Sequence, residues 1–89
     1  MNFPPDEILE PYIGKINYEL IILWMLNNNE APCTWSDLQV NGVIKRSTLS
    51  NKLRKLLERG YVEKQEFNSY IITNEGQGRF YDLSQPQTL

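Results

Sequence analysis

The sequence contains no histidine and only one cysteine, Cys33, among its 89 residues. Without histidine, the chain lacks the side chain that most often acts as a general base near neutral pH and often completes a zinc site. A lone cysteine excludes an intramolecular disulfide and fits a reducing, cytoplasmic setting. No nucleophile–base pair and no phosphate-binding glycine loop is present, so we predict a protein that is not an enzyme and needs no cofactor or metal.

Long apolar runs are missing as well. The longest run, Leu20 to Leu26, is far shorter than the roughly 20 residues that a membrane-spanning helix needs. The N-terminal segment has no basic stretch followed by an apolar run, so we expect neither a signal peptide nor a membrane contact. The length and the ordinary apolar content, 40%, predict one folded domain over residues 1–83 and a flexible tail over residues 84–89.

Net positive charge is also absent, because the chain carries a formal charge of −2 at pH 7. That average hides an asymmetry. Between positions 45 and 64 there are seven basic residues and two acidic ones, Glu58 and Glu63, which leaves +5 for this segment and −7 for the remainder. The seven are Lys45, Arg46, Lys52, Arg54, Lys55, Arg59 and Lys64. Such a separation of charge predicts a polyanion-binding face on an acidic body.

The first half of the sequence predicts three helices. Pro4 and Pro5 favour the start of a short helix, which Pro11 bends and Gly14 ends. Asn17 suits the N-cap of a second helix, Tyr18 to Asn27, whose side chains are apolar all round and therefore call for cover from the core or from a partner. Thr34 and Asp37 form an imperfect capping box at the start of a short third helix, after which the chain makes a tight turn at Asn41-Gly42.

The second half predicts a helix, a hairpin and a final helix. Leu49, Leu53, Leu56 and Leu57 recur at i, i+4, i+7 and i+8, which places one buried stripe on a helix over about 47–59. Ser47, or Arg46 just before it, opens that helix, and Gly60 ends it. Strand-like segments at 61–67 and 70–73 flank a predicted turn at Asn68-Ser69, and Thr73 caps the final helix.

The segment from Ser47 to Lys64 resembles the recognition helix and first wing strand of regulators related to the multiple-antibiotic-resistance (MarR) and phenolic-acid (PadR) families. The segment Ile72-Thr73-Asn74-Glu75-Gly76 resembles the stretch directly after the wing in these families. The resemblance implies an α+β fold, namely a mainly helical winged helix-turn-helix with a small β-hairpin wing. It also implies a transcription regulator that binds double-stranded DNA at the nucleoid as a homodimer, paired through its N- and C-terminal helices.

The predicted helix at 47–59 presents a polar face opposite its leucines. Asn51 has an amide that suits adenine, and Arg54 or Lys55 suits guanine in the major groove. Hydroxyl groups of Ser47 and Thr48 are placed to hold a phosphate, while Lys45, Lys52 and Arg59 neutralise phosphates. The resemblance assigns base reading to the positions of Thr48, Ser50, Asn51 and Lys55. The candidate DNA-binding residues are Lys45, Arg46, Ser47, Thr48, Ser50, Asn51, Lys52, Arg54, Lys55, Arg59, Lys64 and Asn68.

The hairpin has fewer cations than the wings of DNA-binding relatives. Glu63 and Glu66 oppose Lys64, so we expect only a weak contact of Lys64 and Asn68 with the DNA backbone, and a hairpin that merely completes the core is an equally good interpretation. The acidic net charge leaves open an alternative function, a winged-helix protein-interaction module without DNA affinity.

Several aromatic residues and Cys33 are interpreted as structural residues, in the core or at a dimer contact. We expect Trp24 and Trp35 to be core residues and Cys33 to be an inert buried thiol. We interpret four aromatic residues as dimer contacts, because we expect the apolar second helix to need more cover than one short chain offers. They are Tyr12, Tyr18, Phe80 and Tyr81.

Overall fold

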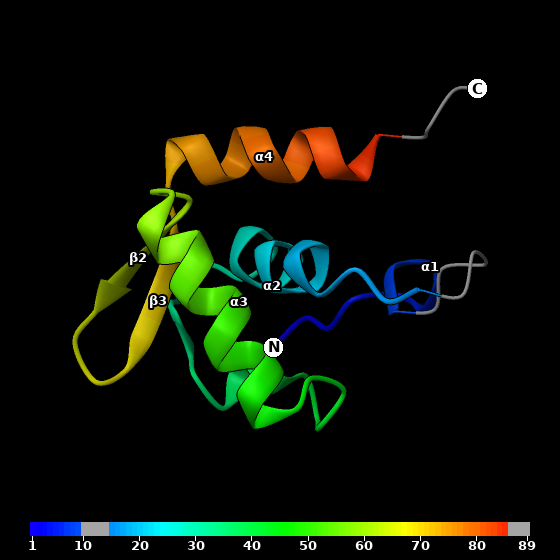
Figure 1. The fold of residues 1–89 in the computed structure, drawn as a ribbon, viewed down its shortest axis with the longest axis horizontal. Coiled ribbons are helices and arrows are strands. Elements are labelled where there is room, and N and C mark those ends of the chain that lie inside the picture. Colours follow the sequence, from blue (N-terminus) through cyan, green and yellow to red (C-terminus); the bar gives the residue numbers. More distant parts are fainter. Residues whose placement is uncertain (10–14, 86–89) are drawn as a thin grey trace.

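The computed structural model describes residues 1–9 and 15–85 of the chain. Within these residues, four α-helices and a small sheet surround one core, which confirms the predicted mainly helical α+β fold (Figure 1). The elements are α1 (Asp6–Leu9), α2 (Tyr18–Asn27), β1 (Cys33–Thr34), the 3-10 helix η1 (Asp37–Gln39), α3 (Arg46–Glu58), β2 (Val62–Gln65), β3 (Ser69–Ile72) and α4 (Asn74–Ser84).

Helix α2 forms the centre of the molecule. Asn17 caps it, as predicted, by accepting a hydrogen bond from the backbone N–H of Leu20 at 3.0 Å. Ile21, Ile22, Leu23 and Met25 are fully buried, and α3, α4 and β3 all pack against the helix. The expectation that α2 needs cover from a second chain is therefore wrong, because the elements of the same chain surround it.

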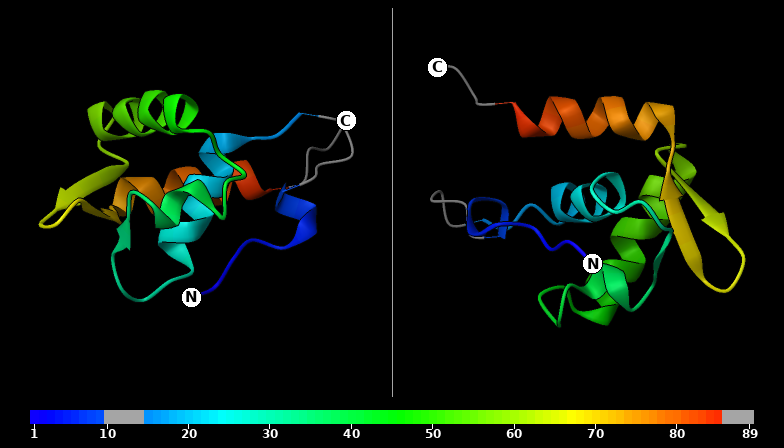
Figure 2. Two further views of the ribbon diagram at one scale, coloured as in Figure 1. Left: turned by 90° about the horizontal axis from the view of Figure 1, so that it is seen from below. Right: turned by 180° about the vertical axis from the view of Figure 1, so that it is seen from behind.

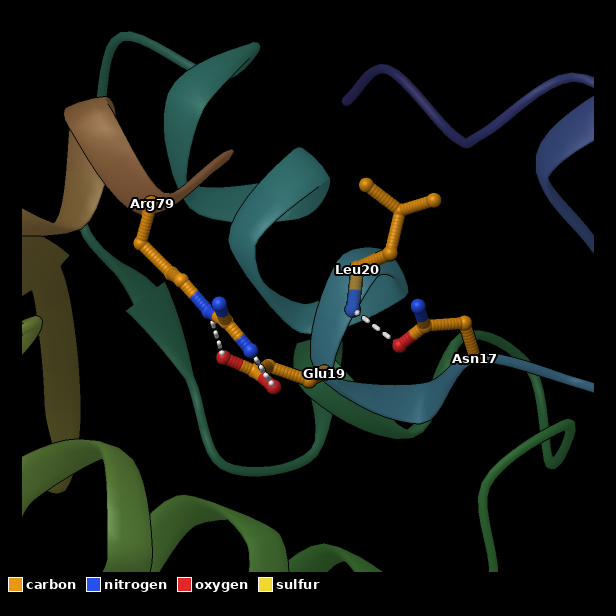
Figure 3. Close-up of polar contacts among 4 residues, drawn as sticks. All are labelled: Asn17, Glu19, Leu20 and Arg79. Carbon is orange, nitrogen blue, oxygen red and sulfur yellow. Dashed lines mark hydrogen bonds and ion pairs between the residues drawn. The ribbon is translucent and has the colours of Figure 1, made fainter. Parts of the chain in front are cut away.

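Helix α4 packs across α2 and is joined to it by an ion pair (Figures 1 and 3). The Arg79 guanidinium donates two hydrogen bonds to the Glu19 carboxylate, at 2.8 and 3.2 Å. These bonds raise the pKa of Arg79 above its usual value, so this side chain stays charged. Thr73 caps α4, as predicted, by accepting from the N–H of Gly76 at 3.0 Å.

The predicted third helix is wrong in extent. Cys33 and Thr34 form β1, an edge strand that pairs antiparallel with β3, so the sheet has the order β1-β3-β2. The capping box does exist, because the N–H of Thr34 donates to the Asp37 carboxylate at 2.9 Å and the N–H of Asp37 donates to the Thr34 hydroxyl at 3.1 Å. It opens only the three-residue η1, because the chain turns into the left-handed region at Val40 and Asn41.

Helix α3 and the hairpin after it match their predicted order but not every bound. Strands β2 and β3 pair antiparallel from Val62↔Ile72 to Gln65↔Ser69. The turn lies one residue earlier than predicted, with Phe67 and Asn68 at its centre and φ values of 59° and 53°. Asn68 is therefore a turn residue, as expected, whereas Ser69 begins β3.

Some predictions fall outside the described residues. The bend at Pro11, the end of the first helix at Gly14 and the dimer contact of Tyr12 lie in residues 10–14, and most of the predicted tail lies in residues 86–89. Among residues 1–9 and 15–85, no helix combines the length and the apolar character that crossing a bilayer requires.

Candidate nucleic-acid interface

The buried side of α3 determines which side of the helix faces solvent. Leu49, Leu53 and Leu56 are buried and Leu57 is half-buried, so the predicted leucine stripe anchors the helix on the core. Gly60 comes after the helix with φ +77°, a conformation that L side chains rarely adopt, and it turns the chain into β2. The anchored stripe leaves the opposite side of α3 facing solvent.

The solvent-facing side of α3 gathers polar and basic side chains of the predicted site. Five of them line one open hollow of about 420 Å³, namely Thr48, Asn51, Lys52, Arg54 and Lys55. They come from successive turns of one helix, so they share a face. This surface, called the α3 face below, offers an amide, a hydroxyl and three cations to an anionic partner.

A second hollow of about 200 Å³ lies on the flank of the α3 face. Lys52, Lys55 and Arg59 line it together with Leu56 and with Glu19 at the start of α2. Sequence reasoning did not single out Glu19, because nothing in its neighbourhood along the chain connects it to α3. Its carboxylate already accepts both hydrogen bonds from Arg79, and none of the described α3 cations forms an ion pair with a described carboxylate.

The N-terminus of α3 carries a further group of candidates. Lys45 is the N-cap residue and its side chain makes no capping hydrogen bond, while Arg46 and Ser47 are exposed in the first turn. The helix thus begins at Arg46, one of the two expected starts, Arg46 and Ser47. The Arg46 guanidinium lies over the Trp35 ring, 5.8 Å from its centroid, which favours one position for this cation.

The remaining candidates lie apart from the α3 face. Ser50 is exposed on α3 but lines neither hollow, and Lys64 and Asn68 belong to the hairpin. Lys64 is exposed between Glu63 and Glu66, which are exposed as well. Sequence reasoning also missed Phe67, because the predicted turn put it at the end of a strand. The structure puts it at the hairpin tip, where its side chain is 92% exposed.

The aromatic residues and Cys33 occupy structural positions. Trp24 and Trp35 pack against the core, as expected, and Cys33 is fully buried. Of the three described residues interpreted as dimer contacts, Tyr18 and Phe80 pack against the core of their own chain, whereas Tyr81 is 64% exposed. Tyr81 is therefore the one of these three that is mainly available to a partner.

The arrangement of a leucine-anchored basic helix between a turn and a hairpin agrees with the comparison to protein families. The MarR family model matches residues 18–68, which is more than half of the chain and runs from α2 to the hairpin tip. A comparison with curated proteins found no match. The chain therefore belongs to the MarR family, whose members regulate transcription by binding DNA.

Proposed function

We propose that the chain is a sequence-specific, homodimeric regulator whose helix α3 enters the major groove of double-stranded DNA. The observation that carries the proposal is the α3 face, in which one amide and cations without an ion pair to any described carboxylate project from a leucine-anchored helix. A helix of this kind fits the major groove, where Asn51 suits adenine and Arg54 or Lys55 suits guanine. Thr48 on the α3 face would be a further base-reading position, and so would Ser50, which is exposed on α3 outside both hollows.

Phosphate contacts would surround the bases read by α3. Lys45, Arg46 and Ser47 sit at the helix N-terminus, where N–H groups and the helix dipole favour an anion. Lys52 and Arg59 extend along the flank of the α3 face, and Lys64 continues onto the hairpin. These residues give orientation and affinity rather than sequence information.

A dimer would present two copies of α3 to successive major grooves. Half-sites would then lie about 34 Å, or about 10 bp, apart. We take residues 1–83 as one domain of this dimer, with α1, α4 and the exposed Tyr81 at the subunit contact. Sedimentation analysis of the wild-type chain should give twice the mass of one chain. The Tyr81→Glu variant should give a mass closer to that of one chain.

The proposal is tested by titrating fluorescent random-sequence duplex DNA at several salt concentrations. Each neutralised phosphate contributes a slope of about −0.9 in log K against log salt, so the wild-type slope should be several times this value. Lys55→Glu should weaken binding by about tenfold or more and make the slope shallower, because it reverses a charge on the α3 face.

Lys15→Glu is the matched control, because it changes the net charge by the same amount at an exposed residue outside α3, ahead of α2. It should bind nearly as the wild type does. No binding by the wild-type chain at low salt would overturn the proposal and would favour a protein-interaction module instead. Equal losses of affinity in both variants would show that net charge, and not the α3 face, decides binding.

A further inference from the structure

Phe67 is exposed to a degree that the fold does not explain. Its side chain is 92% exposed, against 64% for Tyr81 and 44% for Phe3, and it takes no part in the core of the described residues. Isolated apolar residues occur on many protein surfaces, but a phenylalanine with almost no contact gains nothing from its own chain. Exposure alone is not a site, but the backbone and the surroundings of Phe67 are unusual as well.

The backbone at Phe67 is unfavourable for this residue type. The turn Glu66–Ser69 is closed by the N–H of Ser69, which donates to the Glu66 carbonyl at 3.3 Å. Phe67 and Asn68 occupy its two central positions with φ values of 59° and 53°, as in a type I′ turn. Such positions favour asparagine or glycine, and an aromatic residue there is strained. Neither packing nor local conformation therefore accounts for a phenylalanine at the tip.

The tip is held firmly against the body of the molecule. The Asn68 carbonyl accepts a hydrogen bond from the N–H of Trp35 at 3.0 Å, and the Ser69 hydroxyl donates to the Glu66 carbonyl at 2.6 Å. Trp35 also stacks on Arg46, the first residue of α3, so one residue links the hairpin tip with the α3 N-terminus. The backbone that carries Phe67 is thus held in place, so contact with a partner costs little backbone entropy.

The hairpin projects from the body on the side that also carries α3 (Figures 1 and 2). Strand β2 packs against α3, so a duplex seated on the α3 face extends toward the tip. The exposed Asn68 stands next to Phe67 and offers amide donors and an acceptor. Proteins that bind the minor groove combine asparagine, glutamine or basic side chains with an apolar wedge, often phenylalanine, that parts a base step.

We propose that Phe67 is such a wedge, which enters the minor groove beside the site of α3 and partly unstacks one base step. The inference rests on the proposed DNA binding by α3 and adds an apolar contact from the wing. It accounts for a wing without arginine, because an apolar wedge needs no cation at the tip. Gln65 is less suited to help, since its amide lies 3.5 Å from the Glu63 carboxylate.

The test uses the whole chain and a duplex that the wild-type protein selects from a random-sequence pool. Phe67→Asn removes the ring and suits the turn, so its melting temperature should equal or exceed that of the wild type. Its affinity should nevertheless fall by about tenfold, in the range found when an aromatic side chain that stacks on a base is removed. The salt slope should stay unchanged, because no phosphate contact is lost. Phe67→Leu keeps apolar bulk and should retain most of the affinity.

Fluorescence of 2-aminopurine, placed in turn at each base step of the selected duplex, reports unstacking directly. It should rise at one step with the wild type and not with Phe67→Asn. Wild-type affinity and unchanged fluorescence in Phe67→Asn would overturn the wedge while leaving DNA binding by α3 intact. A change in the sedimentation mass of Phe67→Asn would also overturn it, since Phe67 would then contact a second copy. A wild-type chain that binds no duplex would remove the proposed function and the wedge together.

Discussion

At the scale of single residues, Cys33 shows how the core controls the chemistry of one group. Its thiol is fully buried and donates a hydrogen bond to the Met25 carbonyl, with a sulfur-to-oxygen distance of 3.7 Å. Burial, with a smaller contribution from the nearby Asp37 carboxylate, raises the pKa of this thiol to about 11. Both effects keep the proton on sulfur at neutral pH, which removes the thiolate that oxidants and alkylating reagents attack.

We therefore expect native Cys33 to react with iodoacetamide at pH 8 at least on the order of 100-fold more slowly than in the unfolded chain, where the pKa is about 8.5. Mass spectrometry of alkylated chains gives both rates.

The same shift in the pKa of Cys33 makes the stability of the fold depend on pH. The pKa of Cys33 is higher in the folded chain than in the unfolded chain. Its contribution to the free energy of unfolding is therefore present below about pH 8.5 and is lost as the pH rises toward about 11.

Cys33→Ala is the control for the pH dependence, because it removes the titrating thiol and leaves every other ionisable group in place. Between pH 8.5 and 11, the wild type should lose more stability in urea unfolding than the variant does. Equal losses of stability in the wild type and in Cys33→Ala would show that the thiol is open to solvent. Equal alkylation rates for the native and the unfolded chain would show the same.

At the scale of secondary-structure elements, α4 is fitted to the base of the hairpin at one glycine. A Cβ atom on Gly76 would overlap the Tyr61 carbonyl oxygen and would lie 2.8 Å from Ile72 Cγ1. Nearby, the Thr73 hydroxyl donates to the Gly60 carbonyl at 2.6 Å, and the Thr73 N–H donates to the Tyr61 carbonyl at 3.1 Å. These contacts connect the start of α4 with the corner between α3 and β2.

Two glycine substitutions in α4 should act in opposite directions. Gly76→Ala should destabilise the fold by about 1–3 kcal/mol, because a methyl group cannot be placed without moving backbone. Gly78→Ala, in the same helix with nothing within 4 Å of its added Cβ, should stabilise it by about 0.5–1 kcal/mol through helix propensity. Urea unfolding measures both. Changes of the same sign would contradict the packing of α4 on the α3–β2 corner.

The elements also show which features are local in the sequence and which are not. The spacing of Leu49, Leu53 and Leu56 and the stop at Gly60 predicted α3 nearly to its ends, because helix periodicity and capping are local signals. Strand β1 was missed because two residues are too few for alternation, and its pairing with β3 is a long-range contact. The cover of α2 was misjudged for the same reason, since packing partners are distant in sequence.

The candidate site also contains residues that local sequence signals predict and residues that they do not. Thr48, Asn51, Arg54 and Lys55 could be placed on one face from helix geometry alone, and the structure gathers them there. Lys52, which was expected on the flank, lines both hollows. Phe67 could not be found, because a shift of the turn by one residue moves it from a strand to the tip. The stack of Arg46 on Trp35 joins residues on separate segments and leaves no local signal in the sequence.

At the scale of the whole molecule, the charge pattern would orient the approach to DNA. The segment 45–64 carries +5 and the remainder −7, and the cations of this segment lie on α3, at its ends and on the hairpin. Phosphates attract this side and repel the rest, so encounters that present the wrong face are disfavoured. The field weakens with salt, because the screening length is about 10 Å at 0.1 M.

The same division of charge governs behaviour on chromatography resins. A protein of net charge −2 should be retained by an anion exchanger at neutral pH, as its acidic body dictates. Heparin, a sulfated polymer, presents densely spaced anions that match the cations on α3, so the same preparation should also be held by a heparin column. The Lys55→Glu variant should elute from the heparin column at a lower salt concentration than the Lys15→Glu variant, although the two variants have identical net charge. Retention on both supports is thus the behaviour of a molecule whose charge is sorted by face.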